Sequence, residues 1–190
     1  MILVKPSFKF LTKIDNFNHY SVLEDENISV KIICNRGVTH EIVRHRLVTY
    51  SSGYNYKGEV TFVIPPWIET GPGEYNSAYE PSLTPWKQST WLWFRSMLNA
   101  ERSYKELMLC DWSPQQACSV LPNSLKTEIV MTATICEWRH ILKTSTDAMQ
   151  EVMIPILAEF RRLLPILFNN LKLLAWSKVG NFTGSEYEKE

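Results

Sequence analysis

The side chains best suited to chemistry are concentrated in one stretch, residues 36–56, RGVTHEIVRHRLVTYSSGYNY. Its cationic and titratable members fall within eleven positions: Arg36, His40, Arg44, His45 and Arg46. Such a cluster has two interpretations. Cations are stabilised at the carboxyl end of a helix by the backbone dipole, and arginines also line sites for anionic ligands such as phosphates. The spacing alone leaves both interpretations open.

The overall charge confines any anion binding to such a local patch. Lys plus Arg and Asp plus Glu both total 20 among 190 residues, so the formal net charge is zero. This balance gives no indication of a nucleic-acid partner or a membrane surface. With 45% hydrophobic residues the chain can bury a full core. We therefore expect a single domain over residues 1–180, followed by a frayed tail over 181–190.

The cysteines argue against a metal site and against a disulfide framework. They are widely spaced and form no Cys-x-x-Cys pair: Cys34, Cys110, Cys118 and Cys136. We expect reduced, mostly buried thiols in a cytoplasmic protein. The apolar start of the chain is too short for a secretory signal, and no apolar run approaches the roughly 20 residues that span a bilayer.

Two predicted elements position the cationic cluster. Alternating apolar residues over 27–35 predict a half-buried strand. A two-turn helix is then expected from Val38 to about His45. On a helix the side chains of Arg44 and Arg46 point about 200° apart, so both reach one ligand only if the helix ends near His45. The segment after Arg46 is rich in Gly and Tyr, and we expect it to be a loop.

The other elements follow from the same periodicities. Strands are expected over 59–64 and 126–133, and helices over 84–110, from a capping box at Ser113, from Thr134 and from Asp147. Pro155 and Pro165 should kink or divide the last helix. On the last two helices we expect these residues to face inward: Ile135, Trp138, Ile141, Leu142, Val152, Met153, Ile156, Leu157, Phe160 and Leu164. The first helix has an apolar stripe that we expect to be buried: Trp86, Trp93, Met97, Ala100, Tyr104 and Leu107. Strands and helices do not alternate regularly, which favours an α+β domain.

Four segments together resemble one known family: VLEDENISVKIICNRGVTHEIVRHRLVTYS, EVTFVIPPW, SPQQACSVLPNSLKTEIVMTA and EWRHILK. Over roughly residues 21–168 the chain is similar to the flavin-dependent thymidylate synthases (ThyX). The resemblance implies an antiparallel sheet flanked by helices, assembled as a homotetramer. It also implies FAD as hydride carrier, methylenetetrahydrofolate and NADPH as co-substrates, and dUMP as the methylated nucleotide.

The resemblance also assigns residues to ligands. Arg44, His45 and Arg46 match the Arg-His-Arg signature of the family, which implies flavin contacts. Candidates for the nucleotide are Glu41, Ser51 and Tyr54. A second match, Trp-Arg-His, contains Arg139 and His140, for which a structural role is an alternative. No partner base for a nucleophile is identifiable, so the catalytic residues remain unassigned.

Several positions depart from the family pattern, and most of them are ligand positions. Tyr54 stands where the family has Ser, and its loop is shortened and lacks an Arg. Cys118 replaces an Arg, Thr134 and Cys136 replace Asn and Arg, and Asp25 replaces a His. Each lost charge-assisted hydrogen bond costs about 1.5 to 3 kcal/mol of binding free energy.

Three functions remain open. The first is a divergent flavin-dependent enzyme that methylates dUMP or a related pyrimidine nucleotide. The second is a non-catalytic protein that binds or sequesters a nucleotide on the same fold. The third is a degenerate partner subunit.

Overall fold

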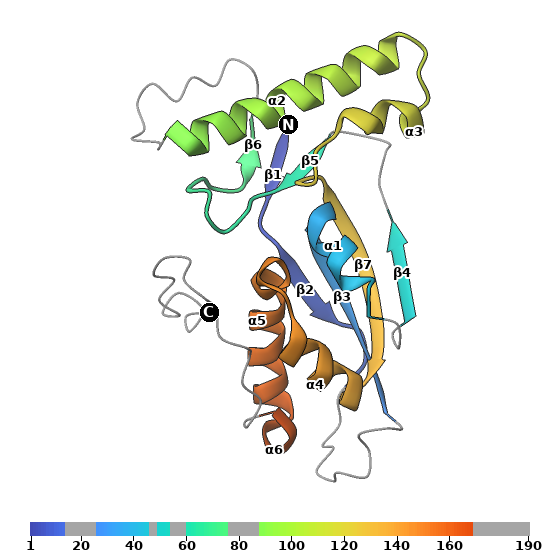
Figure 1. Ribbon diagram of the computed structural model, residues 1–190, viewed down its shortest axis with the longest axis vertical. Coiled ribbons are helices and arrows are strands. Elements are labelled where there is room, and N and C mark those ends of the chain that lie inside the picture. The colour runs from blue at the N-terminus through green and yellow to red at the C-terminus, as the bar shows by residue number, and fades with distance from the viewer. Residues whose placement is uncertain (14–25, 46–48, 54–59, 76–87, 169–190) are drawn as a thin grey trace.

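A computed structural model describes residues 1–13, 26–45, 49–53, 60–75 and 88–168. These residues form an elongated molecule with two sheets (Figure 1). A four-stranded sheet lies beside helices α1, α4, α5 and α6, and a three-stranded sheet lies beside the long helix α2. The mixture of helices and small sheets confirms the predicted α+β class.

The larger sheet is antiparallel throughout and has the strand order β2-β3-β7-β4. The strands are β2 (Ser7–Phe10), β3 (Asn27–Asn35), β7 (Lys126–Thr134) and β4 (Thr49–Gly53). Nine residues of β3 pair with nine of β7, from Asn27 opposite Thr134 to Asn35 opposite Lys126. The predicted strands 27–35 and 126–133 are therefore confirmed.

The loop predicted after Arg46 is wrong in part, because Thr49–Gly53 forms strand β4. Its pairing with β7 places Thr49 opposite Thr132 and Gly53 opposite Glu128. The segment has no apolar alternation that would reveal a strand. It becomes one because the backbone groups on this edge of β7 need hydrogen-bond partners. Tyr54 and the rest of the predicted loop lie outside the described residues.

Helices cover one face of the larger sheet. They are α1 (Arg36–Ile42), α4 (Ile135–Thr144), α5 (Asp147–Leu163) and α6 (Pro165–Phe168). Every residue predicted to face inward on the last two long helices is buried: Ile135, Trp138, Ile141, Leu142, Val152, Met153, Ile156, Leu157, Phe160 and Leu164. Helix α5 continues through Pro155, whereas Pro165 starts the separate helix α6. Both prolines had been expected to kink or divide the helix, and only Pro165 divides it.

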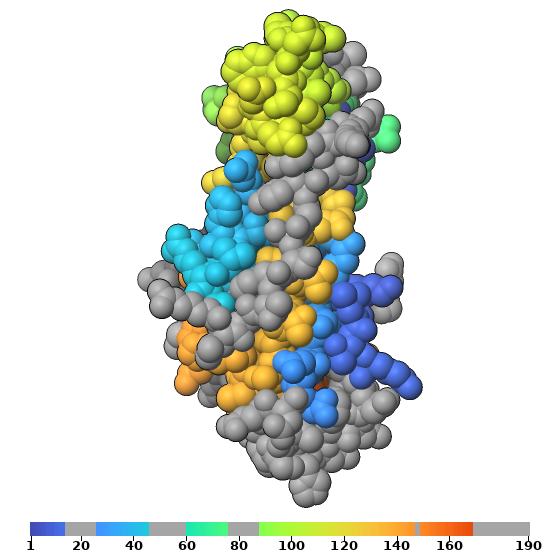
Figure 2. Space-filling view, turned by 90° about the vertical axis from the view of Figure 1, so that its right-hand side faces the viewer, coloured from blue at the N-terminus to red at the C-terminus, as the bar shows by residue number. Residues whose placement is uncertain are grey.

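The opposite face of the sheet carries charged and hydroxyl side chains. Glu128 pairs with Lys31 at 2.6 Å and with Lys126 at 3.0 Å. Ser29 and Thr132 share a hydrogen bond of 2.8 Å between their hydroxyl oxygens. Atoms of β3, β7 and β4 reach the surface over the middle of the molecule (Figure 2). This face is polar, in contrast to the buried face that packs against the helices.

The smaller sheet is mixed rather than antiparallel. Strand β1 (Ile2–Val4) pairs in parallel with β5 (Thr61–Val63) and antiparallel with β6 (Gly73–Glu74). Strands β1 and β6 were not predicted, since each is too short for a clear pattern. Strand β5 lies within the predicted range 59–64, of which residue 59 is not described. Beside this sheet lie α3 (Pro114–Ala117), which begins with the predicted Ser113 capping box, and a 3-10 turn over Cys118–Val120.

Helix α2 (Gln88–Leu109) turns a slightly different face inward than its sequence pattern predicts. Its buried line contains Thr90, Phe94, Met97, Glu101 and Tyr104. The predicted residues Trp93, Ala100 and Leu107 are only partly buried and flank this line. Met97 and Tyr104 are buried as predicted, whereas the apolar spacing does not indicate that Glu101 belongs to this line. It is buried since it pairs with the amino group of Met1 at 2.9 Å.

The cysteines are more exposed than predicted. Cys34 is buried, Cys118 is half-buried, and Cys110 and Cys136 are exposed. Cys136 faces solvent because the inward positions of α4 are taken by larger apolar residues. Within the described residues no group of His, Cys, Asp or Glu is arranged to hold a metal ion. No helix in the same set is long and apolar enough to cross a membrane.

Glu151 is a half-buried acidic residue beside the main core. The Oε1 atom of Glu151 on α5 is shielded from solvent and has no hydrogen-bond partner among the described residues. Burial raises the pKa of Glu151 from 4.5 to about 7. Folding therefore favours the protonated carboxyl, because a charge without a partner is costly in this environment.

We predict that Glu151 makes the fold less stable as pH rises. In the unfolded chain its carboxyl ionises near 4.5 and in the fold near 7, so the folded state holds the extra proton between these values. Its contribution to the unfolding free energy should fall by up to about 3 kcal/mol across this window. Urea unfolding at several pH values should show a flatter pH profile for Glu151→Gln than for the parent.

Glu159→Gln is the matched control, since it makes the same chemical change on the same helix. Glu159 is paired with Arg162 at 2.6 Å, and hydrogen bonding to that guanidinium lowers its pKa. Glu159→Gln should therefore leave in place the decrease in stability that Glu151 causes between pH 4.5 and 7. If Glu151→Gln and the parent have parallel pH profiles, the carboxyl is not buried as described.

Candidate functional site

The cationic cluster is positioned by the short helix α1. Asn35 caps its start by accepting a hydrogen bond of 2.9 Å from the backbone N–H of Val38. The helix ends at Ile42, and the N–H groups of Arg44 and His45 bond to the carbonyls of Glu41 and Ile42, both at 3.2 Å. The predicted helix from Val38 to His45 is thus shifted toward the N-terminus. Arg44 and His45 lie in the turn just beyond it.

Arg44 is held only loosely by the protein. Its Nη2 atom lies 3.5 Å from Oε1 of Glu41, and the Arg44 side chain is 73% exposed. An exposed pair at this distance contributes little to stability. Most of the donors of the guanidinium therefore face solvent, where they can bind an anion in a bidentate manner. The predicted flavin residue Arg44 and the predicted nucleotide residue Glu41 are thus neighbours.

His45 meets a second histidine from α4. The ring centroids of His45 and His140 are 6.5 Å apart, with the rings nearly perpendicular at 81°. Burial lowers the pKa of His45, the charge of His140 lowers it further, and Glu137 opposes the shift. A lowered pKa keeps the His45 imidazole neutral at neutral pH. It can then donate or accept a hydrogen bond, but it supplies no fixed charge to a ligand.

Helix α4 is anchored by Trp138, and this sets the position of His140. The indole N–H donates a buried hydrogen bond of 2.9 Å to the carbonyl of Ile28 on β3. The N-cap Thr134 accepts from the N–H of Glu137 at 3.2 Å, as the sequence predicts. In the Trp-Arg-His match Trp138 is therefore the structural residue, while His140 faces outward toward His45. No local sequence pattern indicates that Glu137 belongs to this electrostatic group.

One position where this chain departs from the family pattern, Cys136, lies at the surface. Cys136 is exposed and precedes His140 by four residues, so both lie on the same side of α4. The family arginine at that position would therefore extend the cationic cluster. Its absence leaves a thiol on the same side of α4 as His140.

Three other predicted ligands are not tested by these contacts. Ser51 lies in strand β4, opposite Val130 of β7. Arg46 and Tyr54 lie outside the described residues. The described contacts thus bring together two groups, Glu41 with Arg44 and His45 with His140. The flavin and nucleotide roles of all these residues stay predictions.

The sequence matches one family model, described as thymidylate synthase complementing protein, over residues 5–166. The chain belongs to this family. The matched range contains every candidate site residue and all of the larger sheet. The resemblance identified from the sequence is thereby confirmed.

Curated relatives support the same assignment. The flavin-dependent thymidylate synthase of Mycobacterium sp. (strain KMS) is 30% identical over 167 residues, which is 83% of this chain and 66% of that protein. The enzyme of the same name from Pyrococcus abyssi (strain GE5 / Orsay) is 27% identical over 186 residues, covering 90% of this chain and 67% of that protein. The chain thus spans just under two thirds of the length of its mycobacterial relatives.

A solved structure shares the fold. It is that of a UMP/dUMP methylase, PolB, from Streptomyces cacaoi bound with 5-Br UMP. The two folds superpose with a TM-score of 0.67 over 88% of this chain and 94% of the other, at 15% sequence identity. At this identity the likeness concerns the fold. The pairing of β3 with β7 and the helices on one sheet face are therefore not peculiar to this chain.

We predict that His45 titrates below its ordinary range, and that its neighbours control this pKa in opposite directions. His140→Gln removes a positive charge and should raise the pKa of His45. Glu137→Gln removes the carboxylate that favours the imidazolium and should lower it. An NMR titration of the His45 ring proton measures both shifts.

His40→Gln is the matched control, because His40 is an exposed histidine on α1 that does not shift the pKa of His45. It should leave the His45 titration unchanged. An unchanged His45 pKa in His140→Gln would contradict the contact between the two rings.

Proposed function

We propose that the chain is a divergent flavin-dependent enzyme that reductively methylates dUMP or a related pyrimidine nucleotide. Methylenetetrahydrofolate would supply the carbon and NADPH the reducing equivalents. The observation that carries the proposal is the exposed Arg44 beside the His45–His140 pair, within the range of the family match. The named activities of the relatives support it, but they belong to proteins that are longer than this chain.

The donors of this cluster fit a flavin dinucleotide in part. A diphosphate needs guanidinium donors that are open to solvent, and the Arg44 side chain provides them. His45 is half-buried and has a lowered pKa, so it would form a neutral hydrogen bond to the cofactor. Arg46 would complete the group. When bound, the flavin supplies hydride chemistry, which no side chain of the cluster can provide.

The nucleotide would lie next to the cofactor, on Glu41, Ser51 and Tyr54. Glu41 is adjacent to Arg44 and partly exposed, so its carboxylate can accept hydrogen bonds from a base or a ribose. A carboxylate would repel a phosphate, so we assign Glu41 to the base or ribose end.

One observation favours an alternative function. The exposed Cys136 stands on the same side of α4 as His140, where the family has an arginine. A thiol provides neither the charge nor the bidentate geometry of a guanidinium. The alternative is a protein that binds or sequesters a nucleotide without catalysis, or a degenerate partner subunit.

We predict that the purified protein retains FAD, seen as a flavin band in its visible absorbance spectrum after excess FAD is removed. Arg44→Ala should weaken FAD binding roughly tenfold or more, since a charge-assisted contact to the diphosphate is lost. Arg162→Ala is the matched control. Arg162 is also an exposed arginine paired with a glutamate three residues earlier, but it lies on α5.

The outcomes separate the three functions. Retained flavin, followed by reoxidation of the reduced flavin that depends on dUMP, supports the enzyme. Binding of dUMP or UMP without flavin supports the sequestering protein. Binding of neither ligand rules out both and leaves the partner subunit. Equal loss of FAD in Arg44→Ala and Arg162→Ala would remove Arg44 from the site.

We also propose that the chain forms a homotetramer. Large apolar side chains are exposed where α2 ends and α3 begins, with Leu109 at 85% and Trp112 at 45% exposure. An exposed apolar patch of this kind is typical of a protein interface. Light scattering should give four times the mass of one chain, and Leu109→Asp should lower that mass. Leu11→Asp, at another exposed leucine, is the control; a monomeric parent would contradict the tetramer.

A further inference from the structure

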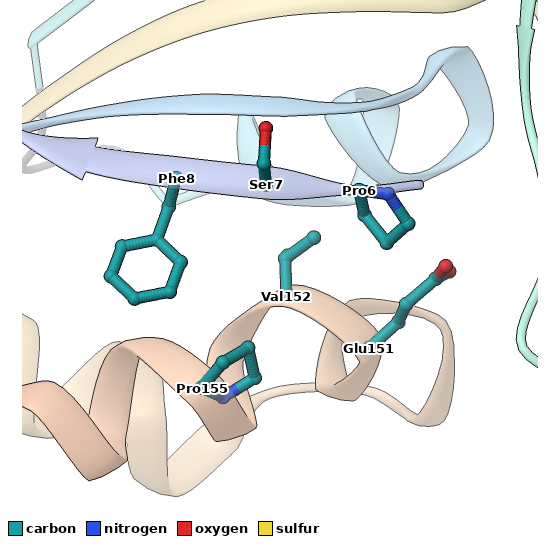
Figure 3. A pocket seen from close by; sticks show the side chains of 6 residues that line it. All are labelled: Pro6, Ser7, Phe8, Glu151, Val152 and Pro155. Carbon is teal, nitrogen blue, oxygen red and sulfur yellow. The ribbon is translucent and has the colours of Figure 1, made fainter. Parts of the chain in front are cut away.

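A pocket separate from the cationic cluster lies between strand β2 and helix α5 (Figure 3). Its volume is about 260 Å³. The residues that line it are Pro6, Ser7, Phe8, Glu151, Val152 and Pro155. Apolar groups form most of this lining, and Glu151 is its one charged residue. The pocket shares no residue with the group around Arg44 and His45.

The packing of β2 on α5 explains why this space is not closed. Phe10 on β2 stacks edge-on against Phe160 of α5, with ring centroids 5.0 Å apart, and this contact spaces the strand from the helix. Toward the start of β2, Phe8 points toward α5 and Val152 points back toward the strand (Figure 3). Pro155 and Pro6 are compact rings that cannot extend into the remaining space. The gap therefore persists at the end of α5 where Glu151 lies.

Glu151 gives this pocket a chemical preference. Its Oε1 atom is buried and accepts no hydrogen bond from any residue that the structure describes. Burial accounts for the rise of its pKa to about 7, and no charged group among the described residues lowers it. The nearby thiol of Cys34 supplies no positive charge: burial and the Glu151 charge raise its pKa to about 12, so it stays neutral. Among the described residues, the Glu151 carboxyl therefore has no cationic hydrogen-bond donor.

We propose that this pocket binds a small molecule that has an apolar ring and a protonated amine. The ring would pack against Phe8, Val152 and Pro155, and the ammonium would donate to the Glu151 carboxylate. A cavity of roughly 150 Å³ suffices for benzene, so 260 Å³ accommodates a ring with one short polar arm. The volume lies just below the range of sites for drug-sized ligands, roughly 300 to 1,000 Å³, which limits the ligand to a single ring.

The test uses benzylamine and its neutral analogue benzyl alcohol as probes. At about pH 8, where Glu151 with its pKa of about 7 is mostly ionised, each probe is titrated into the full-length protein. Amide NMR signals of Ser7 and Val152 report on the pocket. We expect saturable shifts with benzylamine and roughly tenfold weaker binding of benzyl alcohol. Equal affinities, or shifts confined to other parts of the protein, would overturn the proposal.

Two variants make the test specific to Glu151. Glu151→Gln keeps the shape of the side chain and removes its charge. The ratio of the affinity for benzylamine to that for benzyl alcohol should therefore fall to about one. Glu159→Gln removes a carboxylate two turns further along α5 that is already paired with Arg162, and it should keep the preference. If Glu151→Gln still binds benzylamine more tightly than benzyl alcohol, the ammonium contacts another group and the proposal is wrong. Neither result depends on flavin or nucleotide binding.

Discussion

The nine-residue pairing of β3 with β7 is the constraint on which the rest of the structure depends. It joins two segments that are far apart in the sequence and presents one continuous apolar face to α1, α4 and α5. Because α1 directly follows β3 and α4 directly follows β7, their positions are set by the two strand ends. The hydrogen bond from Trp138 to the carbonyl of Ile28 then fixes α4 against the sheet.

Polar groups in the helical layer lie in two different environments. Near the end of α1, Arg44 stays exposed and His45 is only half-buried, so both can still exchange solvent for a ligand. Next to β2, Glu151 is enclosed by apolar groups and loses its ordinary acidity. The first environment favours recognition of an anion, and the second favours a cation.

One departure from the family pattern, Cys136, can be placed in the structure. Cys136 is on the surface side of α4, near His140, and so its change from an arginine costs the fold little. The same change removes a cation from the neighbourhood of the candidate site. Core positions such as Ile135 and Trp138 lie on the other side of the helix and keep their apolar character. The departure at Cys136 thus lies on the exposed side of α4, away from the residues that pack in the core.

The sequence by itself determined the family, the strands at 27–35 and 126–133, and the inward residues of α4 and α5, because burial imposes periods of two and 3.6 residues. Only the tertiary structure decided that Thr49–Gly53 is a strand, since its pairing depends on the open edge of β7 rather than on its own pattern. It also decided that Glu101 and the Oε1 atom of Glu151 are buried and that His45 meets His140. These contacts join segments distant in sequence, so no local pattern encodes them.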